Sequence, residues 1–195
     1  MYIAGIVGFA LMLVYDINSY TVNNRVLQGG FYAGCLLVVG ATAAAVVKAV
    51  RAGAFSDAAD VLLLSLSLIS FALLIYCLFF ALPFAQTYQT PQNGRRVYRC
   101  GAYALCRHPG VLCFWGVYLF LGWAALPDGR LMGMGLLFSL LNTAYAWFQD
   151  RITFPKTFCD YDEYRKTAPF LLPTVRSIVR AGQTWGALYG KEEQP

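Results

Sequence analysis

The sequence predicts an all-α integral membrane protein, built as a helical bundle of about five transmembrane helices with a cytoplasmic amphipathic tail. Hydrophobic residues make up 58% of the 195 residues and charged residues only 13%, a balance far from that of a soluble domain. The apolar residues are gathered in segments close to the roughly 17 to 25 residues that a helix needs to cross a bilayer. Neither a repeat nor a polar linker divides the chain, so residues 1–195 are expected to form a single membrane domain.

Five apolar segments supply the expected helices, at about 3–20, 30–47, 61–82, 110–126 and 131–149. The first is the least regular, because Asp16 and Asn18 follow its apolar run. It also lacks the basic start and the small-residue cleavage pattern of a signal peptide. In the second segment, Gly30 and Gly34 form a GxxxG pattern that two alanines continue at the same spacing. This pattern predicts close packing against another helix.

The last two apolar segments are joined by only four residues, Pro127 to Arg130, which predicts an antiparallel helical hairpin. On the second of these segments, Asn142, Tyr145, Gln149 and Asp150 recur at the spacing of one helix face. Polar groups that face lipid are costly, so this stripe should face the bundle or a wet cavity. The alternative is that Asn142 alone makes a hydrogen bond between helices.

The basic residues predict an orientation. If residues 86–108 are cytoplasmic, that face carries twelve Lys and Arg residues and the other face carries three. Such a bias places the C-terminal tail on the cytoplasmic side as well. Anionic lipid headgroups then suffice to explain the positive net charge, so nucleic acid is not expected as a partner. The six cysteines have no spacing that suits a metal, and we interpret them as small apolar residues.

The most informative stretch is residues 100–111, which contains the only histidine of the chain. Because a proline follows His108, this residue is held out of the α region and should lie with Arg107 on a fixed turn. The next helix is expected to begin at Pro109 or Gly110. The simpler alternative is that Arg107 is only the positive residue that flanks a membrane helix.

The pattern Gly101-x-Tyr103-x-x-x-Arg107-His108-Pro109, followed across a hairpin by an acidic residue and an aromatic tail, resembles the isoprenylcysteine carboxyl methyltransferase and phospholipid methyltransferase superfamily. The resemblance covers about residues 97–173. The family pattern reads G-x-Y-x-x-x-R-H-P-x-Y, then E-E-x-x-L-x-x-x-F-G, then Y-x-x-Y. Here a valine stands at the last tyrosine of the first part, and Asp-Arg stands at the glutamate pair of the second.

The resemblance implies S-adenosylmethionine as the cofactor, in a site that faces the cytoplasm and is formed by residues 86–109 and 150–173. The residues implied in cofactor binding are Gly101, Tyr103, Arg107, His108, Pro109, Asn142, Tyr145 and Asp150. Of these, Arg107 and Asp150 are the implied catalytic residues. Arg107 and His108 would hold the cofactor carboxylate, Asp150 would hold its ammonium group, and a tyrosine would lie near the sulfonium. The implied methyl acceptor is a lipid-like or prenylated molecule with a carboxylate or amine head.

Two other functions stay open. One is a non-enzymatic lipid-binding or assembly protein descended from that family, which the altered glutamate pair favours. The other is a sterol-type membrane reductase, for which the chain lacks a further polar motif. Residues 174–190 are expected to form a basic amphipathic helix at the membrane interface, and the alternative for this helix is a simple anchor.

Overall fold

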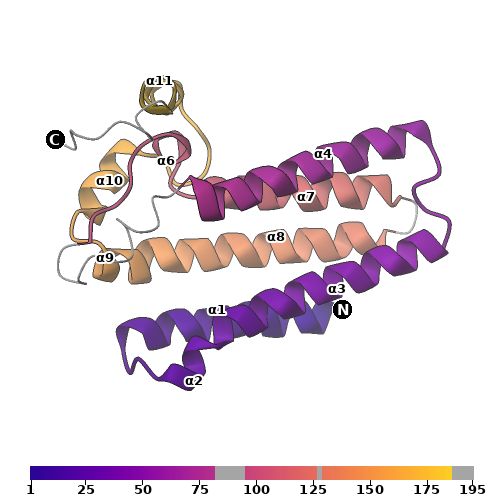
Figure 1. Ribbon diagram of the computed structural model, residues 1–195, viewed down its shortest axis with the longest axis horizontal. Coiled ribbons are helices and arrows are strands. Elements are labelled where there is room, and N and C mark those ends of the chain that lie inside the picture. The colour runs from indigo at the N-terminus through magenta and orange to yellow at the C-terminus, as the bar shows by residue number, and fades with distance from the viewer. Residues whose placement is uncertain (82–94, 127–128, 186–195) are drawn as a thin grey trace. The chain divides into compact units, whose positions relative to one another are not determined.

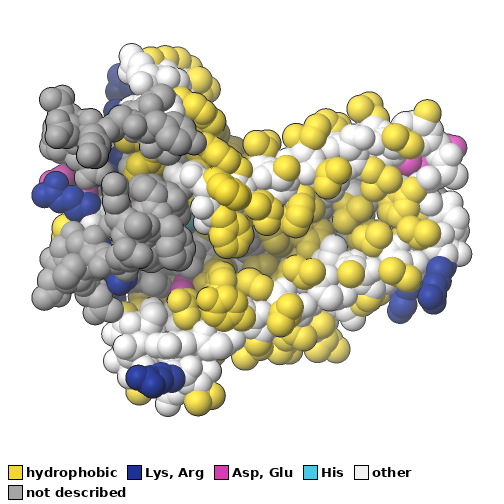
Figure 2. Space-filling model, viewed as in Figure 1, with side chains coloured by type: hydrophobic (Ala, Val, Ile, Leu, Met, Phe, Trp, Pro, Cys, Tyr) yellow, Lys and Arg dark blue, Asp and Glu magenta, His cyan; other side chains and the backbone are white. Residues whose placement is uncertain are grey.

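The computed structural model describes residues 1–81, 95–126 and 129–185, and all regular structure in these ranges is helical (Figure 1). The all-α prediction is therefore confirmed. Among the described residues, four helices are long and apolar enough to cross a membrane: Tyr2–Tyr20, Arg25–Arg51, Ala58–Phe80 and Arg130–Thr157. Hydrophobic side chains cover much of the visible surface of the long helices (Figure 2). The chain is thus a membrane protein.

The first of two compact units comprises residues 1–71 and 114–153. Its elements are α1 (Tyr2–Tyr20), α2 (Arg25–Gln28), α3 (Gly30–Arg51), most of α4 (Ala58–Ile75), most of α7 (Pro109–Ala124), α8 (Arg130–Phe148) and the π-helical turn η3 (Gln149–Thr153). The centre of this unit is closely packed around Phe9, Met134 and Phe138, of which Phe138 is fully buried. Aromatic rings meet edge to face there, as in the pair of Phe9 and Phe138.

Helices α1 and α3 lie in direct backbone contact. A Cβ atom added to Gly34 would stand 2.5 Å from the carbonyl oxygen of Gly8, and one added to Gly8 would stand 2.8 Å from that of Gly34. Ala41 and Ala45 are buried further along α3. The close packing predicted from the GxxxG pattern is therefore confirmed, and α1 is the helix that α3 packs against.

Polar side chains link the helices of this unit. The hydrogen bonds join Thr42 Oγ1 with Tyr118 Oη (2.6 Å), Ser67 Oγ with the carbonyl oxygen of Val117 (2.9 Å), and Trp115 Nε1 with Thr143 Oγ1 (2.9 Å). Such bonds are favoured in a membrane because lipid tails offer no alternative partner.

Helices α7 and α8 form the predicted antiparallel hairpin. Gly122 contacts Met132 near the connection, and Gly135 contacts Tyr118 further along the pair. Helix α7 begins at Pro109, as expected, and ends at Ala124 after 16 residues. Its length of about 24 Å is less than the roughly 30 Å of a hydrocarbon core. It is thus an apolar helix shorter than the four membrane-length helices.

The fifth predicted helix extends further than its apolar run. Residues 131–149 were expected, whereas the helical path continues through η3 into α9 (Phe154–Thr157). Pro155 lies in α9 and has no N–H to donate to the preceding turn. The widened π turn immediately before it lets the chain stay helical past this proline.

The second unit comprises residues 72–113 and 154–195, of which residues 82–94 and 186–195 are not described. Besides α9, it contains the π-helical turn η1 (Tyr76–Phe80), α6 (Ala102–Leu105), α10 (Tyr161–Thr167) and α11 (Val175–Thr184). Its core gathers Val97, Tyr161, Tyr164 and Ala168, with Phe154 and Phe158 packed against them. The aromatic tail is thus a packed part of this unit.

The predicted interfacial helix 174–190 corresponds to α11. Thr174 is its N-cap, and Thr174 and Ser177 form a reciprocal capping box. Residues 186–190 of the predicted helix lie outside the described residues, as do residues 86–94 of the predicted cofactor segment and Pro127 of the predicted hairpin connection.

Candidate functional site

The turn at Arg107 and His108 is fixed from both sides. The backbone N–H of Arg107 donates a 2.9 Å hydrogen bond to the carbonyl oxygen of Pro169. On the other side, Pro109 opens α7, and the N–H of Val111 donates to the carbonyl oxygen of His108. The turn predicted from the proline after His108 is therefore present, and its position depends on the apolar corner that follows α10.

Aromatic rings surround the two polar side chains of this turn. The His108 ring is 8% exposed and stacks on Phe154, with centroids 5.8 Å apart and an angle of 13° between the planes. Phe170 meets the same imidazole edge to face at 5.0 Å. The guanidinium carbon of Arg107 lies 5.7 Å from the centre of the Phe170 ring, within reach of a cation–π interaction. A cation, an imidazole and aromatic surface thus occur together.

Gly101 and Tyr103 connect this turn to its surroundings. Gly101 has a φ angle of +58°, which a side chain would make costly, so the glycine of the motif has a backbone reason. The Tyr103 hydroxyl donates to the carbonyl oxygen of Cys77 at 3.0 Å, and the Tyr103 carbonyl oxygen accepts from the Tyr164 hydroxyl at 2.6 Å. Tyr103 therefore links η1, α6 and α10 through polar bonds.

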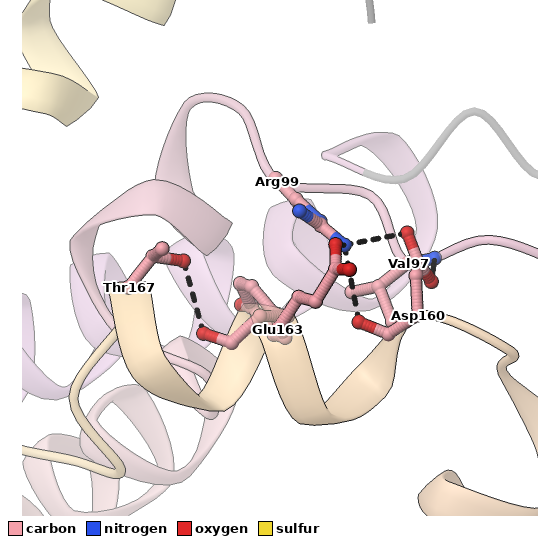
Figure 3. A network of polar contacts seen from close by, with 6 residues as sticks. Val97, Arg99, Asp160, Glu163 and Thr167 are labelled. Carbon is pink, nitrogen blue, oxygen red and sulfur yellow. Dashed lines mark hydrogen bonds and ion pairs between the residues drawn. The ribbon is translucent and has the colours of Figure 1, made fainter. Parts of the chain in front are cut away.

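Asp160 holds the segment that leads into the motif (Figure 3). Its carboxylate accepts a 2.9 Å bond from the N–H of Val97 and a 2.7 Å bond from Nη2 of Arg99. The same nitrogen also donates to the carbonyl oxygen of Asp160, and Glu163 lies 3.5 Å away. Sequence reasoning missed this network. The available signal was an acidic residue just before the Tyr-x-x-Tyr pattern, together with the basic residues between Arg95 and Arg99 that could pair with it.

Burial controls the protonation of two groups beside the turn. Cys106 is fully buried, and burial raises the pKa of its thiol to about 11, although a hydrogen bond with the backbone of His108 partly opposes this rise. Burial also raises the pKa of the Tyr164 hydroxyl well above its usual range. Both groups are therefore neutral at physiological pH.

The remaining predicted site residues belong to the first unit. Asp150 lies in η3 and is 2% exposed. Near it in sequence, the side chains of Tyr145 and Gln149 lie close to the carboxyl group of Asp16, which is buried in α1. Part of the predicted polar stripe therefore faces α1. The sequence pattern showed Asp16 only as a residue that interrupts the first apolar segment. A carboxyl group within a membrane helix is itself a signal that the side chain faces polar groups of another helix.

The predicted site residues thus fall into two groups. Those in the second unit are Gly101, Tyr103, Arg107, His108 and Pro109, and those in the first unit are Asn142, Tyr145 and Asp150. The second unit also adds Arg99, Asp160 and Phe170, which the sequence did not single out. Within residues 1–81, 95–126 and 129–185, no three His, Cys, Asp or Glu side chains are placed to hold a metal ion.

Comparison with known proteins gives no relative: no family model, no curated protein and no solved structure matches the chain.

Proposed function

We propose that this protein is an S-adenosylmethionine-dependent methyltransferase that acts on a lipid-like or prenylated acceptor at the cytoplasmic membrane edge. One observation carries the proposal: Arg107 and His108 lie on a rigid turn against Phe154 and Phe170, at the start of an apolar helix. The motif resemblance at Gly101 to Pro109 supports the same chemistry.

The residues present fit the chemical groups of the cofactor. A guanidinium group matches the planar geometry of a carboxylate and can hold it with two hydrogen bonds, which is the role proposed for Arg107. Phe154 and Phe170 supply aromatic side chains next to His108 and Arg107, the kind of group on which a purine stacks. By the motif resemblance, Asp150 would hold the ammonium group. When bound, S-adenosylmethionine supplies an activated methyl group on its sulfonium for in-line displacement.

The contribution of the chain is then binding and alignment rather than proton chemistry. A carboxylate acceptor is already ionised at neutral pH, so it needs no general base, and His108 is assigned to cofactor binding. Alignment of the reacting atoms and exclusion of water would supply most of the rate. Arg151 follows Asp150 where the family has a second carboxylate, and its charge favours an anionic acceptor head over a protonated amine.

Transfer of a labelled methyl group tests the proposal directly. The protein would be placed in lipid nanodiscs with methyl-labelled S-adenosylmethionine and, in separate samples, a prenylcysteine carboxylate or phosphatidylethanolamine. We expect label in the prenylcysteine fraction with the wild-type chain and, at a cofactor concentration near the wild-type dissociation constant, much less with Arg107→Gln. Absence of label in both acceptors, together with absence of S-adenosylhomocysteine binding, would contradict the proposal.

A second function, a non-enzymatic lipid-binding or assembly protein, is favoured by the burial of His108. An imidazole that is 8% exposed between two phenyl rings can serve as a core side chain without any ligand. This function predicts that S-adenosylhomocysteine does not bind, so the same binding measurement separates the two functions.

A further inference from the structure

Helix α11 presents three different faces, and the first is a narrow face of small residues packed inward. Ser177 and Ala181 are buried to 1% and 4% exposure. The hydroxyl of Thr184, on the same side, accepts a 3.0 Å hydrogen bond from the backbone N–H of Gly101. The small face therefore holds α11 against the turn that begins the Gly101 motif.

The second face is apolar and lies open to the surroundings. Val175 is 80% exposed, and Ile178 and Val179 are each 54% exposed. These residues recur at the spacing of one helical stripe, which Gly182 and Trp185 continue. Large apolar side chains are thus turned outward while the small side chains of the same helix are buried, the reverse of a helix that packs its apolar stripe into a protein core.

The third face is basic. Arg176 and Arg180 are both exposed, and Gln183 continues this side of the helix. Nη1 of Arg180 donates a 2.8 Å hydrogen bond to the carbonyl oxygen of Thr167, which fixes the position of this guanidinium group. The apolar stripe is therefore bordered along its length by positive charge, as in helices that lie in a membrane interface.

The end of α11 is tied to the end of a membrane-length helix. Trp185 stacks on Tyr76 with ring centroids 6.5 Å apart and planes 15° from parallel. Tyr76 begins η1, the final turn of the span Ala58–Phe80, and the neighbouring Phe79 and Phe80 are 61% and 70% exposed. Trp and Tyr side chains, such as Trp185 and Tyr76, are enriched where a membrane span meets the bilayer interface. The apolar face of α11 thus ends beside the end of a membrane-length span.

We propose that α11 docks on the surface of a bilayer that contains anionic lipids, with its apolar stripe in the interface and its arginines at the headgroups. The combination of an open apolar stripe, a basic border and an anchor at a membrane span fits a lipid surface. The opposite face of the same helix bonds to Gly101, so the docked helix also holds the start of the Gly101 motif. This docking does not depend on methyl transfer.

Photochemical crosslinking in nanodiscs tests the docking on the full chain. Photoreactive p-benzoylphenylalanine would replace Ile178 on the apolar stripe or, as the matched control, Gln183 on the basic border of the same helix. The discs would contain phosphatidylcholine alone or phosphatidylcholine with phosphatidylglycerol. We expect lipid adducts from position 178 and few from position 183, with more adduct when phosphatidylglycerol is present.

Removal of one arginine charge beside the apolar stripe of α11 tests whether anionic lipids attract the helix. Arg176→Gln should lower the phosphatidylglycerol-dependent yield about fivefold, the effect of one basic residue at an anionic surface. Arg96→Gln, which removes an exposed arginine outside α11, should leave the yield unchanged. Adducts of position 178 with a second protein chain in place of lipid, equal lipid adducts from both positions, or a yield independent of phosphatidylglycerol would each overturn the proposal.

Discussion

The imidazole ring of His108 stacks on the phenyl ring of Phe154, with the centroids 5.8 Å apart and the planes 13° from parallel. Because of this contact, the effect of His108→Ala would be ambiguous: the substitution removes both the stacking surface and the ring nitrogens. A phenylalanine at this position would keep the surface and remove only the nitrogens.

His108→Phe should therefore fold as the wild type does and bind S-adenosylhomocysteine one to two decades more weakly. This change corresponds to the loss of about 1.5 to 3 kcal/mol for a hydrogen bond to a charged group. Titration calorimetry in detergent measures the affinity, and thermal unfolding serves as the control for folding. Unchanged affinity with unchanged turnover would make His108 a core aromatic residue, and unchanged affinity with lost turnover would make it a catalytic base.

Asp160→Ala should destabilise the second unit. The substitution leaves the N–H of Val97 without its acceptor and removes the carboxylate that pairs with Arg99, which costs on the order of 1.5 to 3 kcal/mol for bonds to a charged group. The expected result is a melting temperature several degrees lower. Asp162→Ala is the matched control, since the Asp162 side chain is 81% exposed and the Asp160 side chain only 19%. Equal melting of the two variants would contradict the structural role of Asp160.

Gly34→Ala should separate α1 from α3. The added methyl group would stand 2.5 Å from the carbonyl oxygen of Gly8, a backbone atom that can move away only if the helices shift. Overpacking of this kind costs about 1 to 3 kcal/mol. Gly40→Ala, in the same helix, adds the same methyl group where no atom lies within 4 Å, so it should be neutral or slightly stabilising. Thermal unfolding in one detergent compares the two variants, and equal losses would refute the close packing.

Cys106 should resist thiol reagents at a pH where Cys159 reacts. Only the thiolate reacts, and with a pKa of about 11 the Cys106 thiol is roughly one part in a thousand ionised at pH 8. Cys106 is also fully buried, whereas Cys159 is exposed. Maleimide labelling followed by peptide mass spectrometry should find Cys159 modified first, and labelling of Cys106 should increase as the pH rises toward 11. Rapid labelling of Cys106 at pH 8 would contradict its burial.

The sequence predicted those features that depend on local patterns. The length of the apolar segments predicted where the membrane helices lie. The GxxxG spacing predicted the face of α3 that packs closely against another helix, and Pro109 predicted the start of α7. It did not predict that the helical path continues past residue 149, because the widened turn before Pro155 depends on backbone accommodation rather than on composition.

The parts of the site that the sequence missed depend on contacts between distant segments. Phe170 meets His108 only because the corner after α10 returns to the turn, and Asp160 meets Val97 across 63 positions of the chain. Asp16 meets Tyr145 and Gln149 through helix packing. Residue types and spacing predicted the turn at Arg107 and His108, whereas the groups that surround it required tertiary structure.

Binding of S-adenosylhomocysteine to the wild-type chain and to Arg107→Gln, measured by titration calorimetry in nanodiscs, tests the proposed function most directly. Arg96→Gln removes the same charge from an exposed position upstream of the same motif and is the matched control. We expect the wild type and Arg96→Gln to bind with equal affinity, and Arg107→Gln to bind one to two decades more weakly, as for the loss of about 1.5 to 3 kcal/mol at a charged hydrogen bond. Absence of binding to the wild type, or equal weakening by both substitutions, would contradict the proposed cofactor site.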